Sequence, residues 1–107
     1  MIKIEIFRNK NNEIYGFRAD NHGASIVCSA VSVLTFNCVN CIEAFTEADF
    51  SFEAAEKGGG FLKIEVGEIK NNAHNHDADL IFNCLLLGLS GVEAQYPEEV
   101  KIIDREV

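Results

Sequence analysis

A cysteine and a histidine are the two residues best placed in this sequence to do chemistry. Cys28 stands three residues after Ser25, and serine is a favourable N-cap for the helix that the sequence predicts from about Ile26. Cys28 is therefore expected in the first helical turn, where unpaired backbone N–H groups and the helix dipole stabilise a thiolate. His22 lies six residues earlier, in a glycine-containing loop that can fold back over the helix N-terminus. A histidine at this place can take the thiol proton and later protonate a leaving amine.

Packing offers a second explanation for Cys28. Cysteine is among the residue types most often buried, and a single helical cysteine near a loop histidine is usually structural. Apolar residues recur along the same helix at steps of three and four and so form a stripe. Cys28 lies off this stripe, on the side of Ser32, and this position favours a functional role. The stripe that we expect to face the core consists of Val27, Val31, Leu34, Cys38, Ile42 and Phe45.

The other three cysteines form a competing pattern. Cys38 and Cys41 have the C-x-x-C spacing of a redox pair or of half a zinc site. With Cys84, His74 and His76, a set of four metal ligands can be assembled. The C-x-x-C motif lies well inside the predicted helix, whereas a redox pair begins at a helix N-terminus, and the chain has no second closely spaced pair. Packing of small residues between helices is the favoured interpretation, so we expect no metal and no cofactor.

The secondary structure that must position Cys28 follows from the periodicity of apolar residues. The expected elements are, in chain order, strands at 2–7 and 14–19, a helix from about Ile26 to near Thr46, strands at 50–53 and 61–66, a helix from Asp77 that ends before Pro97, and a strand at 100–104. Turn residues at 9–12 and three glycines at 58–60 are typical of hairpins. The polar segment 71–76 is expected to be a loop, with Asp77 capping the helix. The order ββα-ββ-α-β predicts an α+β fold, with mainly antiparallel strands and two helices packed on the sheet.

Length and charge narrow the possible functions. The 107 residues carry 9 Lys and Arg against 17 Asp and Glu, a net charge of −8, and 48% of them are apolar. These values predict one domain, 1–107, with one core. The lack of clustered cations argues against direct nucleic-acid binding and against a basic membrane patch. The N-terminus alternates like a strand rather than a signal peptide, and polar residues interrupt the apolar stretch 26–42. We therefore expect no membrane span, a cytoplasmic location and cysteines that stay thiols.

The segment 25–35, Ser-Ile-Val-Cys-Ser-Ala-Val-Ser-Val-Leu-Thr, resembles the core motif of the ribosomal-processing cysteine protease family. In that family a histidine in a glycine-containing loop precedes an Ile-Val-Cys-Ala-Ala-Val-Ser-like helix entry. The likeness covers nearly the whole chain, because its length, its ββα entry, its glycine-rich second hairpin and its leucine-containing second helix occur in the same order.

This resemblance implies an endopeptidase that removes the N-terminal extension of a large-subunit ribosomal protein. By motif, Cys28 would be the nucleophile, His22 the general base and acid, and Ser32 a polar group that supports the site. The resemblance also implies a homodimer. Asp20 is a further candidate, because it could orient His22, but we leave it outside the main hypothesis.

The chain departs from the family pattern near the site. It has Asn-His-Gly at 21–23 where the family usually has Gly-His-Ala, and Ser25 where the family has aspartate. The loop between the histidine and the cysteine is also shorter than in the family. We predict that this loop is a lid over the substrate. Two other classes stay open at this point: a noncatalytic ribosome-associated or partner-binding domain, and a zinc-binding module.

Overall fold

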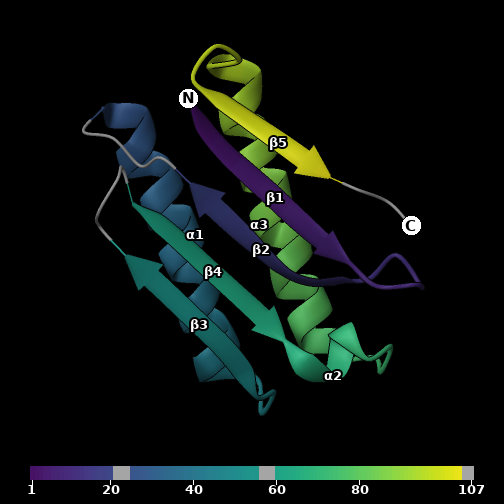
Figure 1. The fold of residues 1–107 in the computed structure, drawn as a ribbon. Helices are drawn as coiled ribbons and strands as arrows, with labels where there is room; N and C mark the ends of the chain where they lie inside the picture. The colour runs from purple at the N-terminus through teal and green to yellow at the C-terminus, as the bar shows by residue number, and fades with distance from the viewer. Residues whose placement is uncertain (21–24, 56–59, 105–107) are drawn as a thin grey trace.

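A computed structural model of the chain describes residues 1–20, 25–55 and 60–104. Within these ranges the strands form one five-stranded sheet in the order β3-β4-β2-β1-β5 (Figure 1). The strands are β1 (Ile2–Arg8), β2 (Ile14–Asp20), β3 (Phe50–Ala55), β4 (Phe61–Val66) and β5 (Val100–Asp104). All neighbouring strands are antiparallel except β1 and β5, which are parallel. The prediction of an α+β fold with mainly antiparallel strands is confirmed.

Two long helices, α1 (Ile26–Phe45) and α3 (His76–Gln95), cover the same face of the sheet (Figure 1). Both begin and end within one residue of the predicted positions. A third, single-turn helix, α2 (Gly67–Lys70), was not predicted, because four residues are too few to show a helical period. The N-cap of α3 is also different from the prediction. The side chain of Asn75, rather than that of Asp77, accepts the hydrogen bond from the backbone N–H of Ala78 at 3.0 Å.

The core lies between this helix layer and the sheet. The alternating isoleucines of β1 and the helix-facing residues of β2 and β4 are fully or almost fully buried there. At its centre Phe17 of β2 meets Phe82 of α3 edge to face, with ring centroids 6.4 Å apart. Phe45, which we expected in the core stripe, is 71% exposed instead. It is the last residue of α1, where few neighbouring elements are left to cover it.

The buried side of α1 also explains its composition. By length and composition α1 could span a membrane, with a mean hydropathy of 1.6, a test that the core helix of a soluble protein passes as well. In this fold one side of α1 packs against the sheet and α3. Its apolar residues are therefore accounted for in part by the core.

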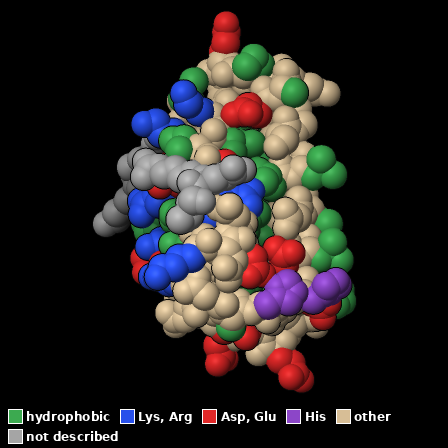
Figure 2. Space-filling view, turned by 90° about the vertical axis from the view of Figure 1, so that its right-hand side faces the viewer, with side chains coloured by type: hydrophobic (Ala, Val, Ile, Leu, Met, Phe, Trp, Pro, Cys, Tyr) green, Lys and Arg blue, Asp and Glu red, His purple; other side chains and the backbone are tan. Residues whose placement is uncertain are grey.

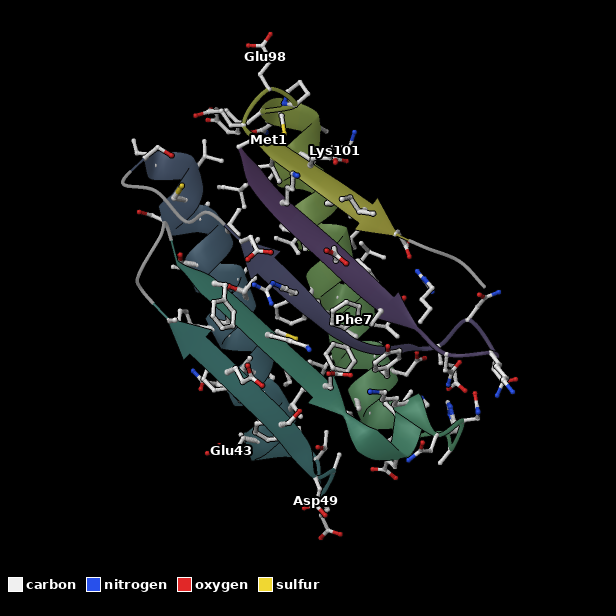
Figure 3. The ribbon with its side chains drawn as sticks, in the orientation of Figure 1. Met1, Phe7, Glu43, Asp49, Glu98 and Lys101 are labelled. Carbon is white, nitrogen blue, oxygen red and sulfur yellow. The ribbon has the colours of Figure 1, made fainter. Side chains whose placement is uncertain are left out.

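The other face of the sheet has no helix over it among the described residues, and it carries aromatic rings covered by cations. The guanidinium of Arg18 lies 4.4 Å from the ring centroid of Phe61, and the Lys63 ammonium lies 5.9 Å from that of Phe7. Figure 3 shows Phe7 on the viewer's side of the sheet, with α1 and α3 behind it.

Charge is distributed unevenly between the two faces. Neither α1 nor α3 contains any of the nine lysine and arginine residues of the chain. In Figure 2 the sheet face lies to the left and the helix layer to the right, and cationic side chains gather on the left while apolar ones protrude on the right. The helix layer therefore presents a surface without positive charge.

Candidate active site

Cys28 lies in the first turn of α1, as predicted. The backbone of Ser25 is extended, with φ −80° and ψ 164°, and its side-chain Oγ accepts a hydrogen bond from the Cys28 N–H at 3.2 Å. Ser25 is therefore the N-cap of α1. The carbonyl of Ser25 accepts the N–H of Ser29 at 3.1 Å, which fixes the first turn around the cysteine.

Cys28 is more buried than the sequence indicated. Only 7% of it is exposed, and it belongs to the core together with Val27 and Val31. The expectation that Cys28 lies off the buried stripe is wrong, because the buried side of α1 is wider than that stripe and also includes Thr35 and Val39. As a nucleophile, Cys28 would have to meet the substrate carbonyl through the small part of its surface that is exposed.

His22 lies outside the described residues, as does most of the loop that was predicted to be a lid, at 21–24. The described chain fixes the two elements that this loop joins. Strand β2 ends at Asp20 and α1 begins at Ile26. The catalytic role of His22 stays a prediction.

The carboxylate of Asp20, which was a candidate to orient His22, forms an ion pair with Arg18. The Nε of Arg18 donates to both carboxylate oxygens of Asp20, at 2.9 and 3.1 Å. Both side chains lie on the open face of the sheet, because the alternate residues Phe17 and Ala19 are buried under the helices. The carboxylate of Asp20 therefore points away from the layer that contains Cys28.

Ser32 is half-buried and lies one helical turn after Cys28 on the same side of α1. The hydroxyl of Thr35 donates to the carbonyls of Val31 and Ser32, at 2.9 and 3.1 Å. Continuing in steps of four residues, the next side chain after Ser32 is Phe36. Phe36 was not predicted as a site residue, although the spacing 28, 32, 36 places it on the same ridge of α1.

The three other cysteines lie away from the first turn of α1. Cys38, Cys41 and Cys84 line one hollow of about 260 Å³ between α1 and α3. All four cysteines of the chain are thiols. Burial, followed by the neighbouring Cys41 and Cys84, raises the pKa of Cys38 to about 12.

The two histidines proposed for a zinc site have carboxylate partners instead. His74 pairs with Glu13, which raises the pKa of His74 first through a hydrogen bond and then through charge, and His76 pairs with Asp77 at 3.1 Å. In the part of the chain that the structure describes, no three His, Cys, Asp or Glu residues are arranged to hold a metal ion. Packing is the better explanation for the C-x-x-C motif.

We expect iodoacetamide to modify the exposed Cys84 far faster than the buried Cys38. At pH 8 a thiol with a pKa of about 12 is ionised to only about one part in 10⁴, and only the thiolate reacts. The rate at Cys38 should rise about tenfold for each pH unit between pH 8 and 10. Tandem mass spectrometry of the modified peptides measures each site separately. Modification of Cys38 as fast as that of the exposed Cys84 would contradict this expectation.

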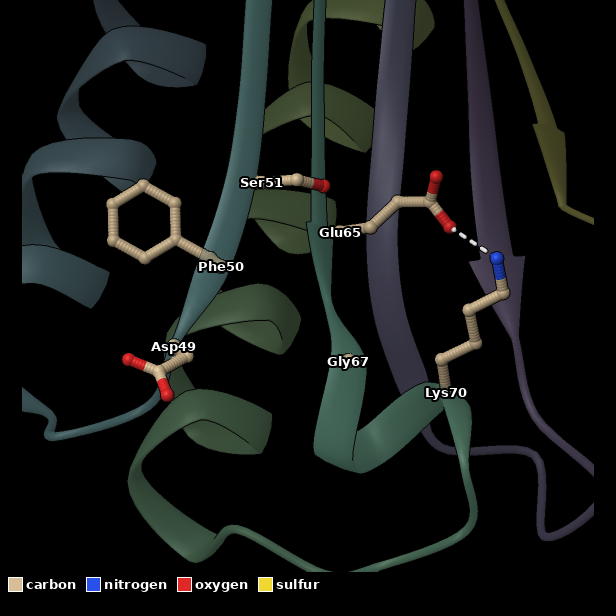
Figure 4. A pocket seen from close by; sticks show the side chains of 6 residues that line it. All are labelled: Asp49, Phe50, Ser51, Glu65, Gly67 and Lys70. Atoms are coloured by element: carbon tan, nitrogen blue, oxygen red, sulfur yellow. Dashed lines mark ion pairs between the residues drawn. The ribbon is translucent and has the colours of Figure 1, made fainter.

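A polar hollow of about 380 Å³ lies at the other end of the sheet from the start of α1, and Figure 4 shows its lining. One of its two carboxylates, that of Glu65, forms ion pairs with Lys63 at 3.2 Å and with Lys70 at 3.1 Å. Desolvation raises the pKa of Glu65, but the hydrogen bonds from Lys70 and Lys63 outweigh it and the net shift is downward. An ionised carboxylate held by two lysines is poorly suited to proton transfer, so this hollow does not compete with Cys28 as a catalytic site.

Comparison with known proteins gives matches over nearly the whole chain. The family described as "Cysteine protease Prp" matches residues 1–101. The chain is 27% identical over 108 residues to the ribosomal processing cysteine protease Prp of Staphylococcus aureus strain Mu50, which covers 95% of this chain and 97% of that protein.

Two solved structures share the fold. The crystal structure of S. aureus Prp with a covalently linked product peptide has a TM-score of 0.84 and 27% identity, over 98% of this chain and all of that one. The crystal structure of SMU.848 from Streptococcus mutans has a TM-score of 0.82 and 30% identity, over 98% of this chain and 96% of that one. The similarity thus includes the elements that position Cys28.

Proposed function

The chain belongs to the cysteine protease Prp family and is a cysteine protease, and from this premise we propose that it removes the N-terminal extension of a large-subunit ribosomal protein. The observation that carries this proposal is the position of Cys28 in the capped first turn of α1. Two comparisons support it: the name of the S. aureus relative, and the product peptide linked covalently to that relative in its structure.

The mechanism that we propose has two steps. The Cys28 thiolate adds to the scissile carbonyl, and backbone N–H groups in the first turn of α1 stabilise the oxyanion. The C–N bond breaks, the protonated His22 gives its proton to the leaving amine, and an acyl thioester is left on Cys28. Water then attacks the thioester with His22 as general base, which releases the carboxylic acid and restores the thiol. Ser32, one turn away, supports the site as a polar neighbour.

A peptide that spans the N-terminal extension of the precursor tests this function. Incubation with the protein, followed by mass spectrometry, should show one defined cut in the extension. A protein that leaves this peptide intact under reducing conditions, but is correctly folded, would favour the noncatalytic partner-binding alternative.

We propose further that the protein is a homodimer and that the second copy covers the outer face of α1 and α3. Val33 of α1 and Leu87 of α3 are 68% and 77% exposed on this helix layer, and Leu80 of α3 is 56% exposed. Neither helix carries a lysine or arginine, and the centres of protein interfaces are similarly poor in charge. A twofold axis would place the same apolar residues of both copies against each other.

The variant Leu87→Glu is expected to convert the dimer to a monomer, because the dimer would bury two carboxylates without partners. Light scattering coupled to size-exclusion chromatography measures the mass directly. Lys3→Glu, on the open face of the sheet in β1, is the matched control and should stay dimeric. A dimer that persists in Leu87→Glu would show that another surface is used.

We also propose a cytoplasmic protein that does not bind nucleic acid directly. The net charge of −8 and the four thiols support this proposal. A negatively charged enzyme would bind ribosomal RNA weakly and attract a basic ribosomal protein.

A further inference from the structure

Two aromatic rings stay half-exposed between α1 and the edge strand β3. Phe36 of α1 and Phe52 of β3 are 47% and 42% exposed, and their rings meet edge to face with centroids 6.5 Å apart and an interplanar angle of 60°. Each ring covers part of the other, but both keep a large apolar surface in contact with water. Such a pair is suited to accept another apolar group.

The pair is aligned with the nucleophile. Four-residue steps along α1 lead from Cys28 through Ser32 to Phe36, and side chains at this spacing form one ridge on a helix surface. Eight residues at 1.5 Å each separate Cys28 from Phe36 by about 12 Å along the helix axis. An extended peptide rises about 3.3 Å per residue, so it covers the same length in three or four residues.

Small side chains lie between Cys28 and Phe36 on this flank of α1. The intervening side chains on this flank of α1 are the serines Ser29 and Ser32, which are small and polar. On the other side β3 is the last strand of the sheet, so that its outer edge has no neighbouring strand among the described residues. A peptide that lies along this flank would pass only small side chains between Cys28 and the two rings.

We propose that Phe36 and Phe52 form a subsite that binds an aromatic or large aliphatic side chain of the substrate, three or four residues from the scissile bond. This inference rests on the proposed peptidase function and adds to it a determinant of sequence preference. Binding of that side chain holds the peptide in line with Cys28.

The position of the rings favours the substrate over a second copy of the chain. Val33 and Leu87, which we assign to the dimer, lie on the outer side of the helix layer, whereas Phe36 faces the helix-side surface of β3 through its contact with Phe52. Its neighbours along the ridge are Ser32 and Cys28 rather than other exposed apolar residues.

The test measures kcat/KM for the precursor peptide with Phe36→Ala, Phe52→Ala and the control Phe45→Ala, whose side chain is 71% exposed at the far end of α1. Each of the first two variants should lower kcat/KM about tenfold to hundredfold, the effect of leaving one large apolar side chain unburied, while the control keeps the wild-type value. Replacement of one apolar residue of the peptide by Ala, three or four positions from the cut, should cause the same loss. That replacement should cause little further loss with Phe52→Ala, because the same contact is already removed.

Phe36→Leu and Phe52→Leu keep an apolar side chain and should retain most of the activity, which separates loss of the subsite from loss of the fold. Wild-type kcat/KM in both alanine variants would overturn the subsite. The subsite would also be overturned if the losses caused by the enzyme and peptide substitutions were fully additive. The same holds if a change of oligomeric state caused the loss of activity. If the wild-type protein itself leaves the peptide uncut, the proposed function fails instead, which is a different result.

Discussion

The variant Cys28→Ala is expected to lose peptide cleavage by a factor of about 10³ or more. Without the sulfur no acyl thioester can form. The first-turn N–H groups of α1 remain, but without a nucleophile no oxyanion forms for them to stabilise. Initial rates of cleavage, followed by chromatography of the peptide products, measure this loss.

The fold should survive the same substitution. Alanine keeps the Cβ of Cys28 and removes one buried atom, so that the melting temperature should change by only a few degrees. Cys84→Ala removes an exposed thiol on α3 and should leave the rate unchanged. Cleavage at the wild-type rate by Cys28→Ala would exclude it as the nucleophile.

The variant Gly16→Ala is expected to lower the free energy of unfolding by about 3 kcal/mol. A Cβ at this position of β2 would lie 2.0 Å from the carbonyl oxygen of Ile64 and 3.0 Å from the Cα of Glu65, both in the backbone of the neighbouring strand β4. Backbone atoms in the middle of a sheet cannot move aside as a flexible side chain can. Urea unfolding followed by circular dichroism measures the change.

Gly91→Ala is the matched control. Nothing lies within 4 Å of a Cβ at this position of α3, and alanine is a better helix former than glycine. This variant should be more stable by about 0.5–1 kcal/mol. Equal stability of Gly16→Ala and the wild-type protein would mean that β2 and β4 can separate more easily than their close approach indicates.

Helices and hairpins could be predicted from the sequence because each has a local signal. Ser25 marks the start of α1, and alternating isoleucines mark β1. Burial depends instead on which neighbours the chain brings to a side chain. This is why Cys28 was expected to be less buried and Phe45 more buried than each is.

The candidate site could be predicted only in its local part. Cys28 and its N-cap Ser25 are three residues apart in the sequence, so their contact could be predicted without tertiary information. The contact between Phe36 and Phe52 joins a helix to a strand sixteen residues further on, and no periodicity links the two.

The central claim, that Cys28 is the nucleophile of an endopeptidase, is tested most directly by covalent labelling with a substrate-derived chloromethyl ketone. The reagent carries the peptide sequence that precedes the cut, and the nucleophilic sulfur displaces chloride from it, which gives a stable thioether. We predict one adduct per chain, located on Cys28 by tandem mass spectrometry, with loss of activity in proportion to labelling and protection by excess substrate peptide. Inactivation with the adduct on Cys38, Cys41 or Cys84, while Cys28 stays unmodified, would contradict the claim.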